Sequence, residues 1–227
     1  MISSIFFDLD GTLADTAPDL ATALNQVLLE RGKPTLPLET IRPAVSLGGN
    51  AMIKLAFAIE EDDPEFTDLR QRFLEIYHER LHQDTHVFPG IEKALDYIET
   101  NNMIWGVITN KPEWLTHPVM EQLSLTQRAA CIVSGDTTEF RKPHPGPMLY
   151  ACELAKCAPE TSLYVGDALR DIEAGRAAGM KTLIADYGYI GKDENPDAWN
   201  ADGSISEPEE IIAWLEKENG LVSKKEQ

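Results

Sequence analysis

The sequence predicts an α/β fold: a parallel sheet of about five strands with helices on both faces, and a separate helical unit inserted after the first strand. From residue 86 onward, short apolar runs alternate with helical segments, which is the order that parallel βαβ units produce. Residues 15–85 instead show helical periodicity without a strand pattern. We therefore expect an α/β core of residues 1–14 and 86–227 and a helical domain of residues 15–85.

The first expected strand is the apolar run 5–7, whose β-branched and aromatic residues show no polar alternation, as in a strand covered on both faces. Asp8 and Asp10 follow it, and side chains alternate along extended chain, so both carboxylates point the same way. Gly11 then permits a sharp turn. Such close carboxylates repel unless a cation lies between them or one is protonated. A capped turn, in which they only accept backbone amides, would also explain them.

The helical unit begins with an expected helix from Ala17 to Arg31, with Pro18 in its first turn and Gly32 after its end. A proline-rich connection and a short helical turn near residues 39–42 lead to the glycine-rich segment 46–50. Apolar spacing predicts two more helices, around residues 52–59 and 66–77.

The remaining segments alternate between helix and strand, which predicts a Rossmann-like core. Pro89 and Gly90 open a helix that ends near residue 101. The polar tail 223–227 is expected to lack regular structure. The expected strands are 104–108, 131–133, 163–165 and 182–185, and the expected helices are 113–123, 147–156, 169–178 and 208–217.

The composition excludes several classes of partner. The 227 residues carry a net charge of -18, which repels nucleic acid and anionic membranes, so we expect neither as a partner. No apolar run approaches the length of a membrane span, and Asp8 comes too early for a signal peptide. The three cysteines lack the spacing of a zinc site and are typical of free thiols. We therefore expect a cytoplasmic protein.

Polar residues follow four of the expected strands, where open α/β sheets bind ligands. Asp8 and Asp10 follow the first strand, and Thr109 follows the second. Lys142 comes after the third, and the segment 166–171, with two aspartates, follows the fourth. Carboxylates can hold Mg²⁺, and one of them can attack phosphorus if cations offset the repulsion. Singly, each residue could be a cap or a surface charge. Their joint position favours phosphoryl transfer.

These four segments resemble the motifs of the haloacid dehalogenase superfamily, in the same order and over essentially the whole chain. The resemblance implies that Asp8 is the nucleophile and that Asp10 is the general acid and base. It also implies a Mg²⁺ site formed by Asp8, Asp167 and the main-chain carbonyl of Asp10, with Asp171 close to these ligands. Thr109, Asn110 and Lys142 would hold the phosphoryl group.

Within the superfamily, the chain looks most like phosphoglycolate phosphatases and their close relatives, which include N-acetylmuramic acid 6-phosphate phosphatases. The helical unit would then be a cap over a small phosphorylated metabolite, in a monomer or homodimer. The segment 46–50 differs from the Gly-Asn-Gly cap loop associated with phosphoglycolate phosphatases. This difference leaves an amino-sugar phosphate as an alternative substrate. Cap residues expected to contact substrate are Arg42, Ser46, Gly49, Asn50 and Lys54, although Arg42 could be structural and Lys54 solvated.

Other reactions of the superfamily remain as alternatives. A dehalogenase is disfavoured because a halide leaving group needs no proton from Asp10. A phosphonatase would use a cap lysine such as Lys54 as a Schiff base. A phosphomutase would use the same acid and base. The remaining alternative is a binding module that keeps the fold without catalysis.

Overall fold

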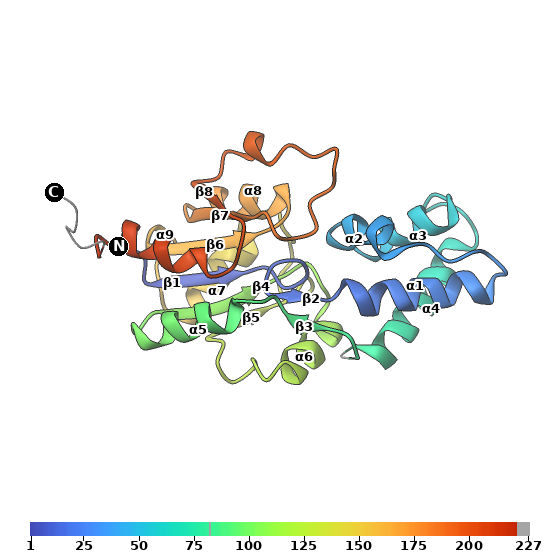
Figure 1. Cartoon of the computed structure of the whole chain (residues 1–227), viewed down its shortest axis with the longest axis horizontal. Coiled ribbons are helices and arrows are strands. Elements are labelled where there is room, and N and C mark those ends of the chain that lie inside the picture. Colours follow the sequence, from blue (N-terminus) through green and yellow to red (C-terminus); the bar gives the residue numbers. More distant parts are fainter. Residues whose placement is uncertain (82, 222–227) are drawn as a thin grey trace.

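The core of the molecule is a six-stranded parallel sheet with the strand order β5-β4-β1-β6-β7-β8 (Figure 1). The computed structural model describes residues 1–81 and 83–221, so the predicted tail 223–227 lies outside the described residues. The strands are β1 (Ser4–Phe7), β4 (Ile104–Ile108), β5 (Ile132–Val133), β6 (Ser162–Gly166), β7 (Lys181–Ala185) and β8 (Gly203–Ile205).

Five of these strands were predicted, and the prediction of a parallel α/β core is confirmed. The strand β8 was missed. It pairs with β7 at one edge of the sheet, where Ile205 is buried but Ser204 is exposed. A three-residue strand that begins with Gly203 offers too little apolar pattern for detection.

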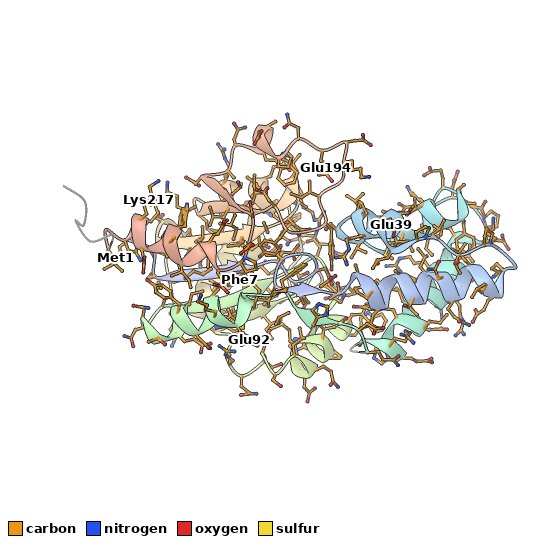
Figure 2. All side chains as sticks on the ribbon, in the orientation of Figure 1. Met1, Phe7, Glu39, Glu92, Glu194 and Lys217 are labelled. Carbon is orange, nitrogen blue, oxygen red and sulfur yellow. The ribbon has the colours of Figure 1, made fainter. Side chains whose placement is uncertain are left out.

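Alternating side chains of the strands divide between two apolar layers. Ile5 and Phe7 belong to the cluster that includes the buried face of α5 (Ile91–Thr100), whereas Phe6 packs with α7 (Gly146–Ala155). This is the alternation that a strand buried on both faces requires. Phe7 lies inside the molecule, and acidic side chains such as Glu92 and Glu194 lie at its periphery (Figure 2). The other core helices are α6 (Glu113–Gln122), α8 (Leu169–Ala177), α9 (Glu210–Glu218), η1 (Pro159–Thr161) and η2 (Pro196–Trp199).

Four helices within residues 17–80 pack on one another beyond the end of the sheet (Figure 1). They bury apolar residues such as Leu24, Ile53 and Phe73 among themselves. The second extends past the helical turn expected at residues 39–42, because Ile41 and Val45 both bury their side chains. These helices are α1 (Ala17–Glu30), α2 (Leu38–Ser46), α3 (Gly49–Phe57) and α4 (Phe66–Arg80).

A short antiparallel ribbon joins the helices to the sheet. It pairs β2 (Ala14–Asp15) with β3 (His86–Val87), so the expectation that Asp15 lies outside any strand is wrong. Two-residue strands carry no periodicity that a sequence could show. Asp19 supports the ribbon, since its Oδ2 accepts hydrogen bonds from the amides of Asp84 and Thr85 at 3.0 and 2.9 Å. Among the described helices, none is both long and apolar enough to cross a membrane.

Candidate active site

The carboxyl ends of three adjacent strands bring the predicted motifs together. Asp8 follows β1, Thr109 follows β4 and Asp167 follows β6, and β1 lies between the other two. All three side chains are buried. Residues 58 to 159 positions apart thus meet because parallel strands end at the same edge of the sheet.

The centre of the site is a cluster of three buried carboxylates, Asp8, Asp167 and Asp171, whose nearest oxygens lie within 4.8 Å of one another. Burial and the neighbouring carboxylates raise the pKa of Asp167 to about 7. Burial also raises the pKa of Asp171, although Lys142 opposes this effect. The protein therefore supplies too little positive charge to offset the repulsion among these three buried carboxylates. A bound cation would relieve this repulsion.

Lys142 is the buried cation of this cluster. Its Nζ lies 3.0 Å from Oδ1 of Asp8 and 2.7 Å from Oδ1 of Asp171, and it also donates to the Tyr164 hydroxyl at 2.7 Å. The Asp8 Oδ1 atom accepts a second hydrogen bond from the Leu9 amide at 2.7 Å. These contacts fix the orientation of the Asp8 carboxylate.

The other two predicted phosphate-binding residues, Thr109 and Asn110, already form hydrogen bonds through their side chains. Asn110 holds the backbone of Lys142 through two hydrogen bonds, 3.0 Å to its carbonyl and 3.1 Å from its amide. The Thr109 hydroxyl accepts from the Lys111 amide at 3.2 Å and retains its own proton for donation. The Asn110 side chain therefore positions Lys142, and the phosphate contact predicted for Asn110 stays a prediction.

Asp10 is held apart from the carboxylate cluster. Its Oδ1 accepts hydrogen bonds from Thr16 Oγ1 at 2.6 Å and from Lys111 Nζ at 2.9 Å. The same ammonium donates to the hydroxyl of Tyr77, on α4, at 2.8 Å. Burial disfavours the charged form of Lys111, but Asp10 and Tyr77 offset this effect and raise its pKa above the ordinary value. The ion pair therefore connects the acid and base candidate to the helical unit.

Glycines leave the space that the cluster needs. Gly11 adopts a φ of +88°, and a Cβ there would collide with the Asp167 carboxylate. A Cβ at Gly188 would collide with Asp167 as well. Together with the raised pKa of Asp167 and the all-oxygen donor set, this cradle fits a hard divalent cation.

A cavity of about 670 Å³ lies between the helical unit and the sheet and includes the candidate nucleophile. Its lining comes from the sheet edge, from α6 and α8 and from the helices α1–α4. The polar and aromatic members of this lining are Asp8, Asp10, Ser46, Asn50, Glu61, Arg70, Phe73, Tyr77, Thr109, Asn110, Lys111, Trp114, Arg141 and Arg170.

Three of the predicted cap residues line this cavity: Ser46, Gly49 and Asn50. Ser46 Oγ donates to Oδ2 of Asp167 at 2.7 Å, so the end of α2 reaches the carboxylate cluster. Asn50 accepts a hydrogen bond from Arg70 Nε at 2.6 Å. The segment 46–50 thus lies beside the carboxylate cluster, and its contact with substrate stays a prediction.

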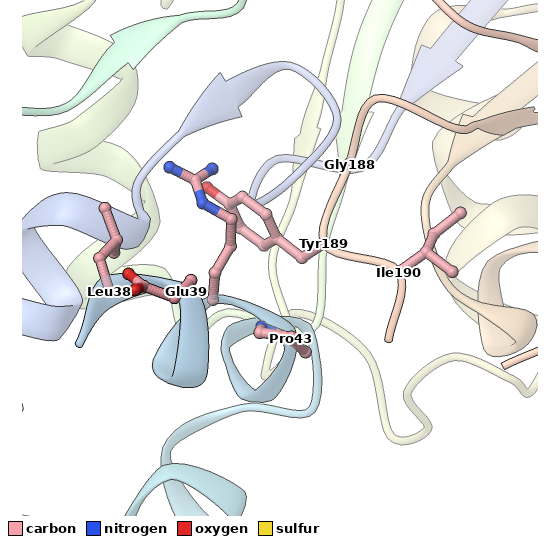
Figure 3. A pocket seen from close by; sticks show the side chains of 7 residues that line it. Leu38, Glu39, Pro43, Gly188, Tyr189 and Ile190 are labelled. Carbon is pink, nitrogen blue, oxygen red and sulfur yellow. The ribbon is translucent and has the colours of Figure 1, made fainter. Parts of the chain in front are cut away.

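Arg42 does not line this cavity. Its guanidinium makes two 3.0 Å hydrogen bonds to the Asp15 carboxylate and lies over the ring of Tyr189, 5.2 Å from its centre. It borders a separate hollow of about 240 Å³ between α2 and Tyr189 (Figure 3). In this structure its contacts are therefore structural, which was the alternative interpretation of Arg42.

Lys54 also lies outside the cavity. Its ammonium pairs with Glu60 at 2.9 Å and with Glu61 at 3.3 Å, and these acids raise its pKa. The acidic loop after α3 thus binds Lys54 instead of leaving it for a substrate.

Several lining residues were not assigned a role from the sequence, namely Arg70, Tyr77, Lys111, Trp114, Arg141 and Arg170. Lys111 follows Thr109 by two residues and could have been found from the alternation of side chains. Arg70 had no such signal, because only the packing of α4 brings it to the cavity.

The fold and site are those of a hydrolase, with a buried carboxylate cluster beside a cavity. Residues 5–185 match the model of the haloacid dehalogenase-like hydrolase family, and the chain belongs to this family. The predicted resemblance is confirmed.

Two relatives and one solved structure are similar to this chain over most of its length. The N-acetylmuramic acid 6-phosphate phosphatase of Pseudomonas putida is 40% identical over 210 residues, which cover 92% of this chain and 94% of the relative. The phosphoglycolate phosphatase of Xanthomonas campestris pv. campestris is 41% identical over 214 residues, covering 93% and 96%. A crystal structure described as a predicted phosphoglycolate phosphatase from Haemophilus somnus 129PT superposes with a TM-score of 0.84 at 25% identity, covering 94% and 98%.

Proposed function

We propose that this chain is a Mg²⁺-dependent phosphatase that hydrolyses a small phosphate monoester through an aspartyl phosphate on Asp8. Its relatives named phosphoglycolate phosphatase support the phosphatase activity. The observation that supports this most strongly is the position of Asp8. It lies at the cavity, in a cluster of three carboxylates, with Lys142 at 3.0 Å. We also propose that residues 15–85 act as a cap domain, connected to the core through the ribbon of β2 and β3.

In the first step, the Asp8 carboxylate attacks phosphorus and the ester oxygen leaves. Lys142 and the Leu9 amide hold Oδ1 of Asp8, so the carboxylate needs no reorientation before the attack. The Thr109 hydroxyl and the Lys142 ammonium are the groups that hold the phosphoryl oxygens.

Asp10 serves both halves of the reaction. It gives a proton to the departing alkoxide and then takes one from the water that attacks the aspartyl phosphate, which releases inorganic phosphate and restores Asp8. Its contacts with Thr16 and Lys111 hold it beside the cavity, two residues from Asp8.

Asp8 and Asp167 would hold the Mg²⁺ ion, with the main-chain carbonyl of Asp10, and Asp171 would lie next to them. The ion supplies charge that offsets the repulsion between phosphate and carboxylates. In its absence these residues carry the burial and repulsion that raise the pKa of Asp167.

Two substrates are candidates. Phosphoglycolate is the first, by similarity. N-acetylmuramic acid 6-phosphate is the second, and the size of the cavity favours it, because about 670 Å³ far exceeds what a two-carbon acid fills. Phe73, Tyr77 and Trp114 also provide aromatic surface in the lining, to which a sugar ring can pack. Both candidates carry a carboxylate in addition to the phosphate.

The proposal is tested by phosphate release from p-nitrophenyl phosphate with and without Mg²⁺. We expect metal-dependent turnover in the wild type and a loss of roughly 10³-fold or more in Asp8→Asn, which keeps the shape of the side chain but removes the nucleophile. Unchanged turnover in Asp8→Asn would refute the mechanism. Comparison of kcat/KM for the two candidate substrates then decides between them.

A further inference from the structure

The cavity differs in charge from the rest of the chain. Acidic residues outnumber Lys and Arg by 38 to 20 overall, yet the cavity is lined by four cationic side chains and three acidic ones. The cations are Arg70, Lys111, Arg141 and Arg170, and the acids are Asp8, Asp10 and Glu61. A locally cationic cavity in an acidic protein attracts an anionic ligand.

Two of the four cations are balanced by neighbouring carboxylates. Lys111 pairs with Asp10 at 2.9 Å. Burial disfavours the charged form of Arg170, but Asp171, Asp8 and Asp167 offset this effect and raise its pKa. These two side chains therefore serve the reacting end of the cavity, where the phosphate is expected.

Arg70 and Arg141 are different. Arg70 uses its Nε for Asn50, and Arg141 uses its Nε for the carbonyl of Gly135 at 2.6 Å. Neither guanidinium forms an ion pair within residues 1–81 and 83–221. The remaining acid of the lining, Glu61, pairs with Lys54 at 3.3 Å. Each arginine thus holds its position through Nε and keeps its terminal nitrogens for a ligand.

The two arginines come from opposite sides of the cavity. Arg70 belongs to α4 of the helical unit, whereas Arg141 belongs to the loop that leads from β5 to Lys142. A ligand between them would contact both the cap and the core. The phosphate is provided for at Asp8 and Lys142, so these two arginines suit a second anionic group of the same molecule.

We propose that Arg70 and Arg141 bind a carboxylate of the substrate and make the enzyme selective for phosphorylated carboxylic acids. The proposal rests on the proposed phosphatase function and names the substrate class of the same site. Guanidinium groups present paired N–H donors that match the two oxygens of a carboxylate. A single negative charge also suits a cavity that already contains Glu61 better than a second phosphate does.

The test uses pairs of phosphate esters that differ in the carboxylate. N-acetylmuramic acid 6-phosphate and N-acetylglucosamine 6-phosphate differ only in the lactyl group that carries it, and phosphoglycolate is paired with 2-hydroxyethyl phosphate. The measured quantity is the ratio of kcat/KM for acid over neutral ester. We expect a ratio above about ten for the better pair in the wild type, since charge-assisted hydrogen bonds to a carboxylate are stronger than neutral ones.

Arg70→Ala and Arg141→Ala should each lower this ratio by about tenfold, chiefly through KM for the acid, and Arg70→Lys should restore it in part. The matched control is Arg72→Ala, because Arg72 lies on the same helix but pairs with Glu30 at 2.8 Å and does not line the cavity. It should leave the ratio unchanged.

If the arginine variants lose kcat/KM equally on the acid and on the neutral ester, the carboxylate assignment is overturned. The same holds if neither variant changes the ratio of kcat/KM for acid over neutral ester. A preference for glucose 1,6-bisphosphate over glucose 6-phosphate that depends on these arginines, without one for the acids, would assign them to a second phosphate and also overturn it. Turnover of p-nitrophenyl phosphate distinguishes the two levels of the proposal: its absence in the wild type refutes the phosphatase function, whereas its presence with an unaffected ratio refutes only the carboxylate subsite.

Discussion

Removal of the metal should make the stability of the protein depend on pH in an unusual direction. In the metal-free protein Asp167 keeps its proton up to about pH 7, whereas a free aspartate loses it near 3.8. The folded state therefore binds more protons between these values, and stability falls as the pH rises through this window. The cause is the burial of Asp167 together with the charges of Asp171 and Asp8 beside it.

The size of the effect follows from the same values. A difference of roughly 3 pH units at about 1.4 kcal/mol each gives about 4 kcal/mol for Asp167. For a chain of this length 1 kcal/mol corresponds to about 2–4 °C in Tm, so Tm should fall on the order of 10 °C between pH 4.5 and 7.5. Added Mg²⁺ should restore Tm at pH 7.5 and have little effect at pH 4.5, where Asp167 is protonated.

Thermal unfolding followed by circular dichroism in EDTA, at constant ionic strength, measures this dependence. Asp167→Asn is the control, since it removes the titrating group while its amide oxygen still accepts hydrogen bonds. The variant should lose most of the pH dependence and the stabilisation by Mg²⁺. A metal-free Tm that does not change between these pH values, or an equal slope in the variant, would refute the reasoning.

Three further predictions concern single residues. Asp10→Asn should lower kcat by about 10²–10⁴-fold and slow hydrolysis of the aspartyl phosphate more than its formation, so acid-quenched samples should contain more phosphoenzyme than the wild type. Lys142→Met should lower the free energy of unfolding by about 3–5 kcal/mol in urea titrations, because it leaves Asp8 and Asp171 buried without their cation, and a loss below 1 kcal/mol would contradict the buried ion pair. Lys54→Ala should leave kcat/KM within about twofold on both candidate substrates, since Lys54 pairs with Glu60 outside the cavity, and a tenfold loss would return it to the substrate site.

Much of the fold could be predicted because its signals are local. The run 5–7 is apolar on both faces, and its buried position in the middle of the sheet explains this pattern. The ribbon of β2 and β3 and the edge strand β8 could not be predicted in this way. Each is only two or three residues long, and its pairing depends on chain that is distant in sequence.

For the cap residues too, the sequence could not predict which side chains pair with one another. Arg42 and Lys54 have the right chemistry for substrate binding, but Asp15 and Glu60 pair with them in the folded protein. Arg70 and Arg141 gave no motif, yet both line the cavity. Whether a cation on a helix is paired or available depends on which acids the tertiary structure brings near it.

The sequence by itself determined the order of five core strands along the chain and the residue types that follow them, because hydrophobic periodicity and strand ends are local properties. It thereby placed Asp8, Lys142 and Asp167 at one edge of a parallel sheet. The tertiary structure alone decided how the four helices lie over that edge, and so which side chains enclose the cavity. Those contacts join residues far apart in sequence, and their geometry depends on packing between elements rather than on the pattern within any one of them.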